Sequence, residues 1–258
     1  MRIQRRYLEQ MIGEGVVHEA SPGHYWLDLA AYRQMRHDRF VWTMRMDPGR
    51  PQYIVGYGSL MDDESRSRTS PAAGPAQPVE LHGYTRGWFS KGRTIGFSTT
   101  FLGIVADPRG SLNAVIYEVQ PAEVMATDRR ESSYCRVGVE PWQLRLLEGS
   151  SAYAENPQTW VYVSPPRNVV PPSERYPIVQ SYVDIFLSGC LQQEERFHLE
   201  GFTEQCVATT ADWSEHWVND RIYPRRPFIY QPRARQIDEL LSTRLPRYFS
   251  RIRIEGGR

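Results

Sequence analysis

The sequence predicts an α+β fold, and three observations carry that prediction. Tyr53–Tyr57 is an apolar run that leads into glycine and serine, which is typical of a buried strand ending in a turn. Strand-like runs follow at 79–88, 99–105 and 113–119 with no helical pattern between them. A long helical pattern with a wide apolar stripe comes only later, at 177–191. Because strands and helices do not alternate regularly, a doubly wound parallel sheet is excluded.

The first 50 residues predict an N-terminal extension that packs on the body. MDPGRPQ at 46–52 is rich in turn residues and marks the boundary, so we begin the main domain at residue 51. Within the extension, four apolar residues have helical spacing: Leu27, Ala30, Ala31 and Met35.

In the main domain, 51–206, turn residues and prolines mark where the predicted strands and helices begin and end. ADPRGS at 106–111 predicts a hairpin turn between two strands. Pro121 fits the first position of a helix over 122–130. Two further strands are expected at 134–139 and 159–163. After the domain, a Trp/Arg-rich C-terminal extension, 207–258, includes a short helix around 236–245.

Length and composition exclude several classes of protein. The chain has 258 residues, a net charge of +1 and 40% hydrophobic residues, which suits one large domain with a core and excludes global disorder. No run approaches the roughly 18–20 apolar residues of a membrane span, and the basic N-terminus lacks the apolar core of a signal peptide. We therefore expect a cytoplasmic protein with no membrane partner.

Charge is distributed unevenly along the chain. Residues 51–220 carry 13 basic and 21 acidic residues, whereas residues 221–258 carry 10 and 3. We expect the arginines of this tail to pair with the acidic body, within or between subunits. Nucleic-acid binding is not expected, because the tail has no recognisable motif or helix for a groove.

The sequence predicts neither a metal site nor a cofactor. The six histidines do not cluster at ligand spacing, and no phosphate-binding or dinucleotide-binding glycine motif occurs. The three cysteines are odd in number and far apart, so neither a disulfide framework nor a zinc site is predicted: Cys135, Cys190 and Cys206. With no histidine near it in sequence, Cys135 is interpreted as a small core residue rather than a nucleophile.

Two segments are candidates for chemistry. GYGSL at 56–60 follows the apolar strand directly, where successive backbone N–H groups form a nest for an anion such as a carboxylate. An ordinary strand-ending turn is the alternative interpretation. DRRESSYCRV at 128–137 places Glu131 among basic and aromatic side chains, where the alternative is a solvated helix end with local ion pairs: Arg129, Arg130, Tyr134 and Arg136.

Five segments follow one another between residues 53 and 191. They are YIVGYGSL at 53–60, LHGYTRGWF at 81–89, FLGIVADPRGSLNAVIYEV at 101–119, RESSYCRV at 130–137 and PIVQSYVDIFLSGCL at 177–191. In order and spacing these segments resemble the γ-glutamylcyclotransferase-like proteins, which include the ChaC group and the AIG2-like proteins. The resemblance implies a small mixed β-barrel flanked by helices, with a cavity whose rim is the glycine turn.

The resemblance also implies a reaction in which the substrate supplies its own nucleophile. In the family, the α-amino group of a γ-glutamyl compound attacks its own γ-carbonyl, which gives 5-oxoproline and releases an amine. Such an enzyme needs no cofactor, only a shape that brings the two groups together and one carboxylate that moves protons.

The resemblance assigns roles to individual residues. Glu131 matches the catalytic glutamate, and because a general base gains from partial burial, we expect the neighbouring arginines not to pair with it closely. The turn that binds the γ-glutamyl moiety matches four consecutive residues: Tyr57, Gly58, Ser59 and Leu60. Tyr134 and Arg136 are predicted to support the substrate site from its surroundings.

Other functions stay open at this point. The turn reads YGSL as in the ChaC group, which favours glutathione, but the sequence after Trp88 lacks that group's fuller pattern. The alternatives are a non-catalytic ligand-binding or regulatory module on the same fold, and an enzyme that cleaves a larger γ-glutamyl intermediate. The two extensions are expected to cover the cavity mouth or to make the contact of a homodimer.

Overall fold

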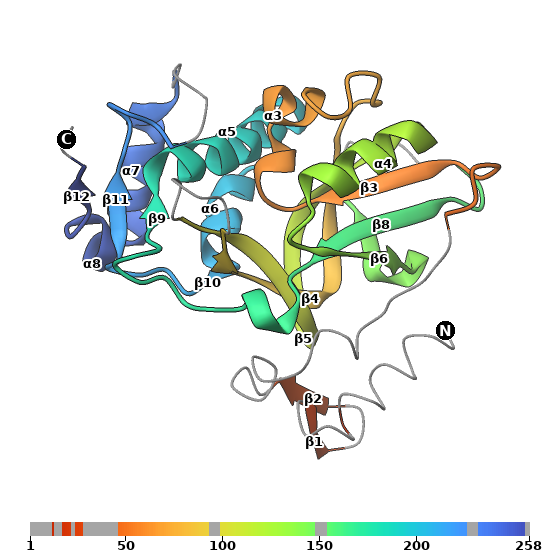
Figure 1. The fold of residues 1–258 in the computed structure, drawn as a ribbon, viewed down its shortest axis with the longest axis horizontal. Helices are drawn as coiled ribbons and strands as arrows, with labels where there is room; N and C mark the ends of the chain where they lie inside the picture. The colour runs from red at the N-terminus through yellow and green to blue at the C-terminus, as the bar shows by residue number, and fades with distance from the viewer. Residues whose placement is uncertain are drawn as a thin grey trace.

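The computed structural model describes residues 12, 17–21, 24–27, 46–92, 99–147, 154–225 and 232–255 (Figure 1). Its main sheet has seven strands in the order β10-β4-β5-β3-β8-β6, with β7 paired to β4 outside this path. A two-stranded sheet, β1-β2, and a three-stranded sheet, β12-β11-β9, lie apart from it.

The bounds of the elements are as follows. The strands are β1 Val17–Ser21, β2 His24–Leu27, β3 Gln52–Gly56, β4 Gln77–Lys91, β5 Thr100–Val119, β6 Cys135–Val139, β7 Leu144–Leu146, β8 Gln158–Val163, β9 Ile178–Val179, β10 Thr210–Ala211, β11 Trp217–Asn219 and β12 Arg253–Ile254. The α-helices are α3 Asp63–Ser67, α4 Pro121–Arg130, α5 Gln180–Phe197, α6 Phe202–Ala208, α7 Ala234–Arg244 and α8 Pro246–Phe249. Three short 3-10 helices are η2 Ser59–Met61, η3 Pro141–Gln143 and η4 Pro166–Asn168.

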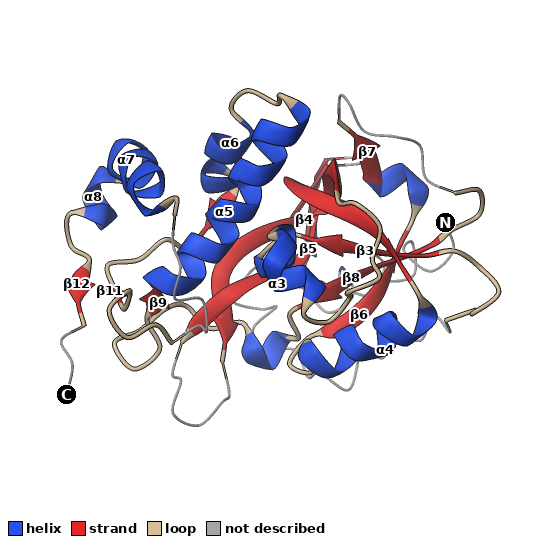
Figure 2. Cartoon of the chain, turned by 90° about the horizontal axis from the view of Figure 1, so that it is seen from above, coloured by secondary structure: helices blue, strands red, loops and turns tan. Residues whose placement is uncertain are grey.

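The main sheet is mixed, and β3 lies at the point where strand direction changes. Ile54 pairs with Tyr117 of β5 in an antiparallel ladder and with Trp160 of β8 in a parallel one. The sheet curls into an open half-barrel, and helices flank it (Figure 2). The predicted α+β class, with a mixed sheet flanked by helices, is confirmed.

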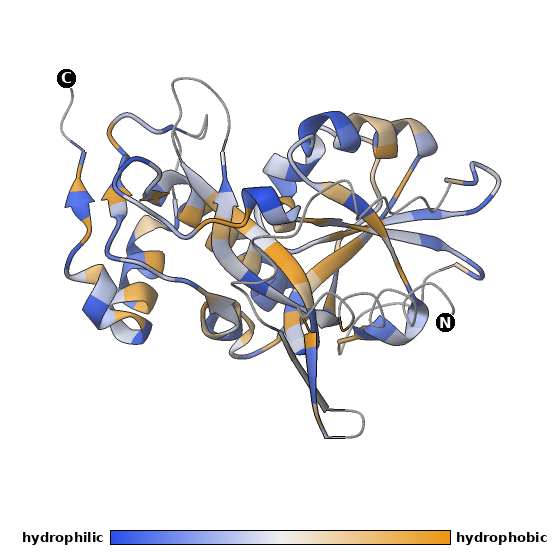
Figure 3. Cartoon of the chain, turned by 60° about the horizontal axis from the view of Figure 1, so that its bottom comes forward, coloured by the Kyte–Doolittle hydropathy of each residue, from blue (hydrophilic) through white to orange (hydrophobic). Residues whose placement is uncertain are grey.

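Alternation along β3 explains why both faces of the sheet are buried. Ile54 belongs to a core cluster that also includes Phe186 of α5, whereas Tyr53 and Val55 belong to a second cluster on the opposite face. The colouring by hydropathy shows hydrophobic residues following the central strands (Figure 3). A strand buried on both sides reads as a continuous apolar run, which is why the sequence identified it.

The predicted hairpin turn at 106–111 is wrong, because β5 passes through that segment as one strand. β4 pairs with β5 on both sides of it, with Tyr84 opposite Ala106 and His82 opposite Ser111. The register shifts between His82 and Tyr84, so the additional residues of β5 form a bulge rather than a reversal. Two turn-forming residues, Asp107 and Gly110, are accommodated by this bulge.

The helices predicted at 122–130, 177–191 and 236–245 are confirmed as α4, α5 and α7, although α5 continues six residues beyond 191, to Phe197. α4 begins at Pro121, and its first turn is closed by a hydrogen bond from the Gln120 backbone N–H to Glu123 Oε2, 2.9 Å long. α5 begins three residues later than Pro177, because Ile178 and Val179 form the short strand β9. In the N-terminal extension, Leu27 belongs to β2 and not to a helix, and the rest of that predicted helix lies outside the described residues.

The arginines of the tail pair with the acidic body, as the charge distribution predicts. The pairs run from the C-terminal segment to α5, α6 and the loops beside them: Arg221–Asp184, Arg233–Glu195, Arg244–Glu204, Arg251–Glu215 and Arg253–Glu174. None of the helices in the described part of the chain combines the length and the hydropathy that crossing a membrane requires.

The expectation that the cysteines form no disulfide is wrong. Cys190 of α5 and Cys206 of α6 form a disulfide in the core, whereas Cys135 on β6 is not part of it. The two cysteines are 16 residues apart, and the packing of α6 on α5 brings them together. Sequence spacing does not report that packing.

Candidate functional site

The glycine turn, defined here as residues 56–60, connects the end of β3 to η2. Tyr57 is buried, and its hydroxyl donates a hydrogen bond of 2.6 Å to the Tyr162 carbonyl of β8. The carbonyl of Gly58 accepts the Met61 N–H at 3.0 Å, which folds the chain back into η2. A Cβ atom on Gly58 would lie 3.1 Å from the Tyr182 hydroxyl, so glycine lets the turn approach α5 closely.

Glu131 is positioned by the end of α4. It is the C-cap of that helix with φ −91° and ψ 30°, and its backbone N–H still bonds to the Thr127 carbonyl at 2.8 Å. The chain then turns, because the Tyr134 N–H bonds to the Glu131 carbonyl at 2.8 Å. This turn leaves the Glu131 side chain 16% exposed and brings the Tyr134 hydroxyl within 2.8 Å of the Leu102 carbonyl of β5, to which it donates.

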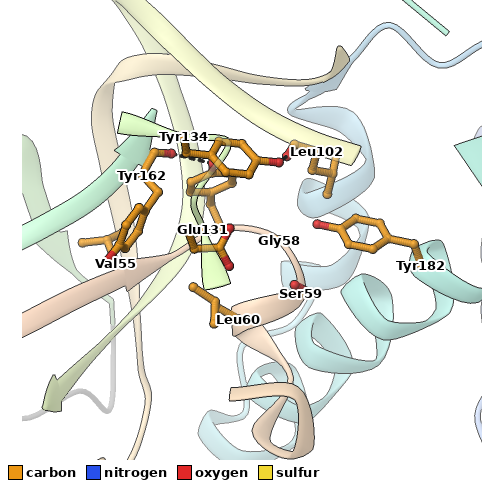
Figure 4. A pocket seen from close by; sticks show the side chains of 10 residues that line it. Val55, Gly58, Ser59, Leu60, Leu102, Glu131, Tyr134, Tyr162 and Tyr182 are labelled. Atoms are coloured by element: carbon orange, nitrogen blue, oxygen red, sulfur yellow. Dashed lines mark hydrogen bonds between the residues drawn. The ribbon is translucent and has the colours of Figure 1, made fainter. Parts of the chain in front are cut away.

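The glycine turn and Glu131 share one pocket, of about 300 Å³ including the space that opens to solvent. Figure 4 shows the Glu131 carboxylate directed into the space between the turn and the tyrosine rings, with Tyr182 reaching in from α5. The pocket is lined by Val55, Tyr57, Gly58, Ser59, Leu60, Leu102, Glu131, Tyr134, Tyr162 and Tyr182. One carboxylate, aromatic rings and the backbone of a tight turn are therefore what the pocket offers a ligand.

Burial favours the neutral form of two tyrosines of the pocket, Tyr57 and Tyr162. Burial raises the pKa of Tyr57 well above its usual value, and the nearby Tyr134 and Glu131 raise it further. Burial also raises the pKa of Tyr162, with a further contribution from Asp128, to which its hydroxyl donates a 2.8 Å hydrogen bond. Among the lining residues, Glu131 is the side chain suited to proton transfer near neutral pH.

Seven residues were predicted for the site, and Arg136 is the one that does not line the pocket. The six that line it are Tyr57, Gly58, Ser59, Leu60, Glu131 and Tyr134. Its guanidinium lies 3.3 Å from Asp128 Oδ2 and 4.5 Å from the centre of the Trp160 ring. Because Asp128 accepts the Tyr162 hydroxyl, Arg136 is linked to the pocket through those two residues. A direct contact of Arg136 with substrate stays a prediction.

The expectation that the arginines stay away from Glu131 is wrong. Arg130 Nε lies 3.2 Å from Glu131 Oε1, and Arg130 Nη2 donates to Ser59 Oγ at 3.1 Å. The two side chains meet because the helix ends at Glu131, whereas successive residues inside a helix point in different directions. From the sequence, Arg130 was placed near Glu131, but no contact between them was predicted. The one indication of this contact is that Arg130 directly precedes the glutamate in the chain.

Leu102, Tyr162 and Tyr182 reach the pocket from three other elements and were missed in the sequence. Tyr182 lies on the buried stripe of α5, where an aromatic residue reads as core. It does pack as core, with ring contacts to Phe101 at 5.2 Å and to Trp88 at 5.8 Å between centroids. In the sequence, the only indication that Tyr182 also lines the pocket is its place in the segment 177–191, one of the five segments that resemble the family.

The C-terminal extension supports the pocket from behind. Trp213 lies 5.2 Å from Trp88, ring to ring, and stacks on Trp217 at 5.1 Å. Trp88 in turn contacts the ring of Tyr182, which lines the pocket. Within the described ranges, no three side chains of His, Cys, Asp or Glu gather as a metal site would require.

Comparison with known proteins gives similarity of structure only. A scan with protein-family models finds no match, and a search of curated protein sequences finds none. A solved structure of a gamma-glutamyl cyclotransferase matches with a TM-score of 0.47 and 16% identity, over 62% of this chain and 88% of that one. A gamma-glutamyl cyclotransferase specific to glutathione from yeast matches with a TM-score of 0.40 and 13% identity, over 63% and 98%.

An AIG2-like protein from Mus musculus also matches, with a TM-score of 0.30 and 19% identity, over 45% of this chain and 78% of that one. These scores describe a partial likeness in the course of the backbone, and none of them bears on what this chain does.

Proposed function

We propose that the pocket binds the γ-glutamyl group of a small γ-glutamyl compound and that Glu131 is the general acid and base that converts it to 5-oxoproline. The observation that supports this proposal is the carboxylate of Glu131, which is directed into the pocket opposite the glycine turn.

The lining favours a reaction in which the protein supplies no nucleophile. The hydroxyl of Ser59, the serine among the lining residues, accepts a hydrogen bond from Arg130, and a cation is not a base that could activate it. Cys135 is not among the lining residues, and burial raises the pKa of its thiol, which disfavours the reactive thiolate. The α-amine of the substrate itself then serves as the nucleophile.

The proposed reaction moves two protons through Glu131. Glu131 accepts a proton from the substrate ammonium, and the free amine attacks the γ-carbonyl carbon to form a five-membered ring. Glu131 passes that proton to the leaving nitrogen as the bond between this nitrogen and the carbon breaks, and it then carries the second proton of the ring nitrogen to the released amine, which departs as an ammonium ion. The products are 5-oxoproline and an amine or amino acid, so one carboxylate completes the cycle unchanged.

The neutral tyrosines have a separate task in this proposal. Tyr134 and Tyr57 both donate their hydroxyl hydrogens to backbone carbonyls, so their rings are fixed as walls of the pocket. Fixed walls favour the folded shape of the glutamyl chain in which its amine meets its carbonyl. In the same proposal, the extensions 1–50 and 207–258 flank a main domain at 51–206, and the latter extension stiffens the wall formed by Tyr182.

The test is release of 5-oxoproline from a panel of γ-glutamyl amino acids, glutathione and γ-glutamyl amines, measured by mass spectrometry. The wild type should release it from at least one member, and Glu131→Gln should reduce release by about 100-fold or more. Glu155→Gln, a change of the same kind at an exposed loop position, should leave release unchanged. Failure of the wild type on every member would contradict the proposed reaction, and ligand-induced thermal shifts would then identify a non-catalytic binding module.

A further inference from the structure

Arg130 connects the two halves of the pocket. Its guanidinium is 23% exposed and donates to Ser65 O at 2.6 Å, to Ser65 Oγ at 2.8 Å and to Ser59 Oγ at 3.1 Å. Ser59 belongs to the glycine turn, and Ser65 lies in α3 directly after it. The same guanidinium reaches Glu131 through its Nε atom.

Arg130 contacts Glu131 through its Nε atom. This atom lies 3.2 Å from Glu131 Oε1, while the two Nη atoms of Arg130 donate to the serines. One oxygen of Glu131 is held by a cation, and the carboxylate still faces the pocket (Figure 4).

Arg130 places a cation beside Glu131. Phenols from five further parts of the fold also surround the carboxylate, namely from the glycine turn, β5, the turn after α4, β8 and α5: Tyr57, Tyr117, Tyr134, Tyr162 and Tyr182. A second cation, Arg66 of α3, lies 5.1 Å from the centre of the Tyr117 ring. The pKa values of Tyr57, Tyr117 and Tyr162 are all raised, chiefly by burial, so these phenols carry no charge near neutral pH. Burial and phenols alone would favour a protonated carboxyl, whereas a cation within 4 Å favours the carboxylate.

We propose that Arg130 is a positioning residue, which aims the Glu131 carboxylate at the substrate held by the glycine turn and keeps that carboxylate ionised. The proposal rests on the proposed function, because it assigns Arg130 a role in the reaction of the same pocket. Arg130 touches neither substrate nor the reacting atoms in this account. It acts through Glu131 on one side and through Ser59 and Ser65 on the other.

The first test is the dependence of kcat/KM on pH for Arg130→Gln, with Arg129→Gln as the matched control from the exposed face of the same helix turn. We expect Arg130→Gln to reduce kcat about ten-fold. We also expect it to move the acid limb of the profile to higher pH by about one unit, because the cation that favoured the carboxylate is gone. Arg129→Gln should change neither quantity.

Arg130→Lys separates charge from geometry. Lysine keeps the cation but cannot reach Glu131, Ser59 and Ser65 together, so the acid limb should return toward the wild-type position while kcat stays reduced. A purely structural role would lower the thermal midpoint in both variants without moving the acid limb. If Arg130→Gln does not fold, the split between kcat and the acid limb in Arg130→Lys carries the test.

A second measurement is independent of turnover. The titration of the Glu131 side-chain carboxyl carbon is followed by NMR in the wild type and in Arg130→Gln, with the signal assigned through Glu131→Gln. The midpoint should be higher in Arg130→Gln by about one unit. An unchanged midpoint would overturn the proposed role of Arg130, even if the wild type releases 5-oxoproline. A shifted midpoint in a protein that releases no 5-oxoproline would overturn the proposed reaction alone.

Discussion

Two of the arginines that hold the glycine turn, Arg130 and Arg86, lie in contrasting surroundings. Arg130 is partly exposed and pairs with a carboxylate. Arg86 of β4 is 0% exposed, and one of its bonds, 3.0 Å long, goes to the Tyr57 carbonyl at the turn. The six acceptors recorded for Arg86 are all neutral: Tyr57 O, Asn113 O, Asn113 Oδ1, Cys206 O, Thr209 Oγ1 and Thr210 Oγ1.

The contrast separates stability from chemistry. Burial lowers the pKa of Arg86 to about 9, so it is still a cation at neutral pH, and its cost of burial is offset by hydrogen bonds and by the Phe186 ring 4.8 Å away. Its partners lie in the glycine turn, in β5, in and directly after α6, and in β10, which makes it a structural joint between the main sheet and the chain around α6. Arg130 touches the one carboxylate of the pocket, so its loss is expected to alter reaction more than folding.

The largest expected effect is that of Arg86→Met on stability. Methionine fills much of the volume but leaves buried acceptors without donors, so the free energy of unfolding should fall by at least about 3 kcal/mol. Urea unfolding measures it, with Arg235→Met on the exposed face of α7 as a control expected to show almost no change. Equal or greater stability in Arg86→Met would mean that relief from burying a charge outweighs the lost hydrogen bonds, and the joint would then not exist.

The disulfide should come next, because it ties α5 to α6 beside the Arg86 joint. For a sequence separation of 16 residues, the linkage stabilises the fold by about 3 kcal/mol in the chain-entropy model. Urea unfolding with and without reductant measures the difference. Alkylation of the unfolded, unreduced protein should label Cys135 alone, and labelling of all three cysteines without reductant would contradict the linkage.

A smaller effect is expected where α5 presses on the chain after the glycine turn. A Cβ atom on Gly189 would lie 2.5 Å from the Asp62 nitrogen and 2.6 Å from the Met61 carbonyl carbon. Gly189→Ala should therefore shift η2, lower the free energy of unfolding by about 1–3 kcal/mol and reduce release of 5-oxoproline. Ser188→Ala, one position away in the same helix, is the comparison; equal losses in both variants would show that the effect is general to α5.

The smallest effect is predicted for Cys135→Ala. Cys135 lies four positions after Glu131 in sequence, but it belongs to β6 and is not among the lining residues. Release of 5-oxoproline should stay within about two-fold of the wild type, since small changes outside the reacting groups cost little. A loss comparable with that of Glu131→Gln would reverse the assignment and make the thiol the reactive group.

Local signals in the sequence were sufficient for the parts of the site that are continuous in the chain. The apolar run before GYGSL identified β3 and the turn, and Pro121 identified the start of α4, so the helix end that presents Glu131 was also located. Tyr162 and Tyr182 could not be found in this way, because β8 and α5 bring them in by tertiary packing.

The errors have the same origin. ADPRGS has the composition of a turn, but pairing of β4 along both sides of it keeps β5 extended. Cys190 and Cys206 are far apart in sequence and adjacent only after α6 packs on α5. Arg86 did leave a signal that was not used, since an arginine within the apolar run TRGWF has to be either exposed or fully bonded.

The measurement that tests the account most directly follows the oxygen of the solvent. The wild type is incubated with its best γ-glutamyl compound in water enriched in the heavy oxygen isotope, and the products are weighed by mass spectrometry. Attack by the substrate's own amine yields 5-oxoproline with no heavy oxygen, and Glu131→Gln should release this product at least about 100-fold more slowly. Glutamate that carries one heavy oxygen would show that water is the nucleophile, and it would contradict the proposed role of this pocket.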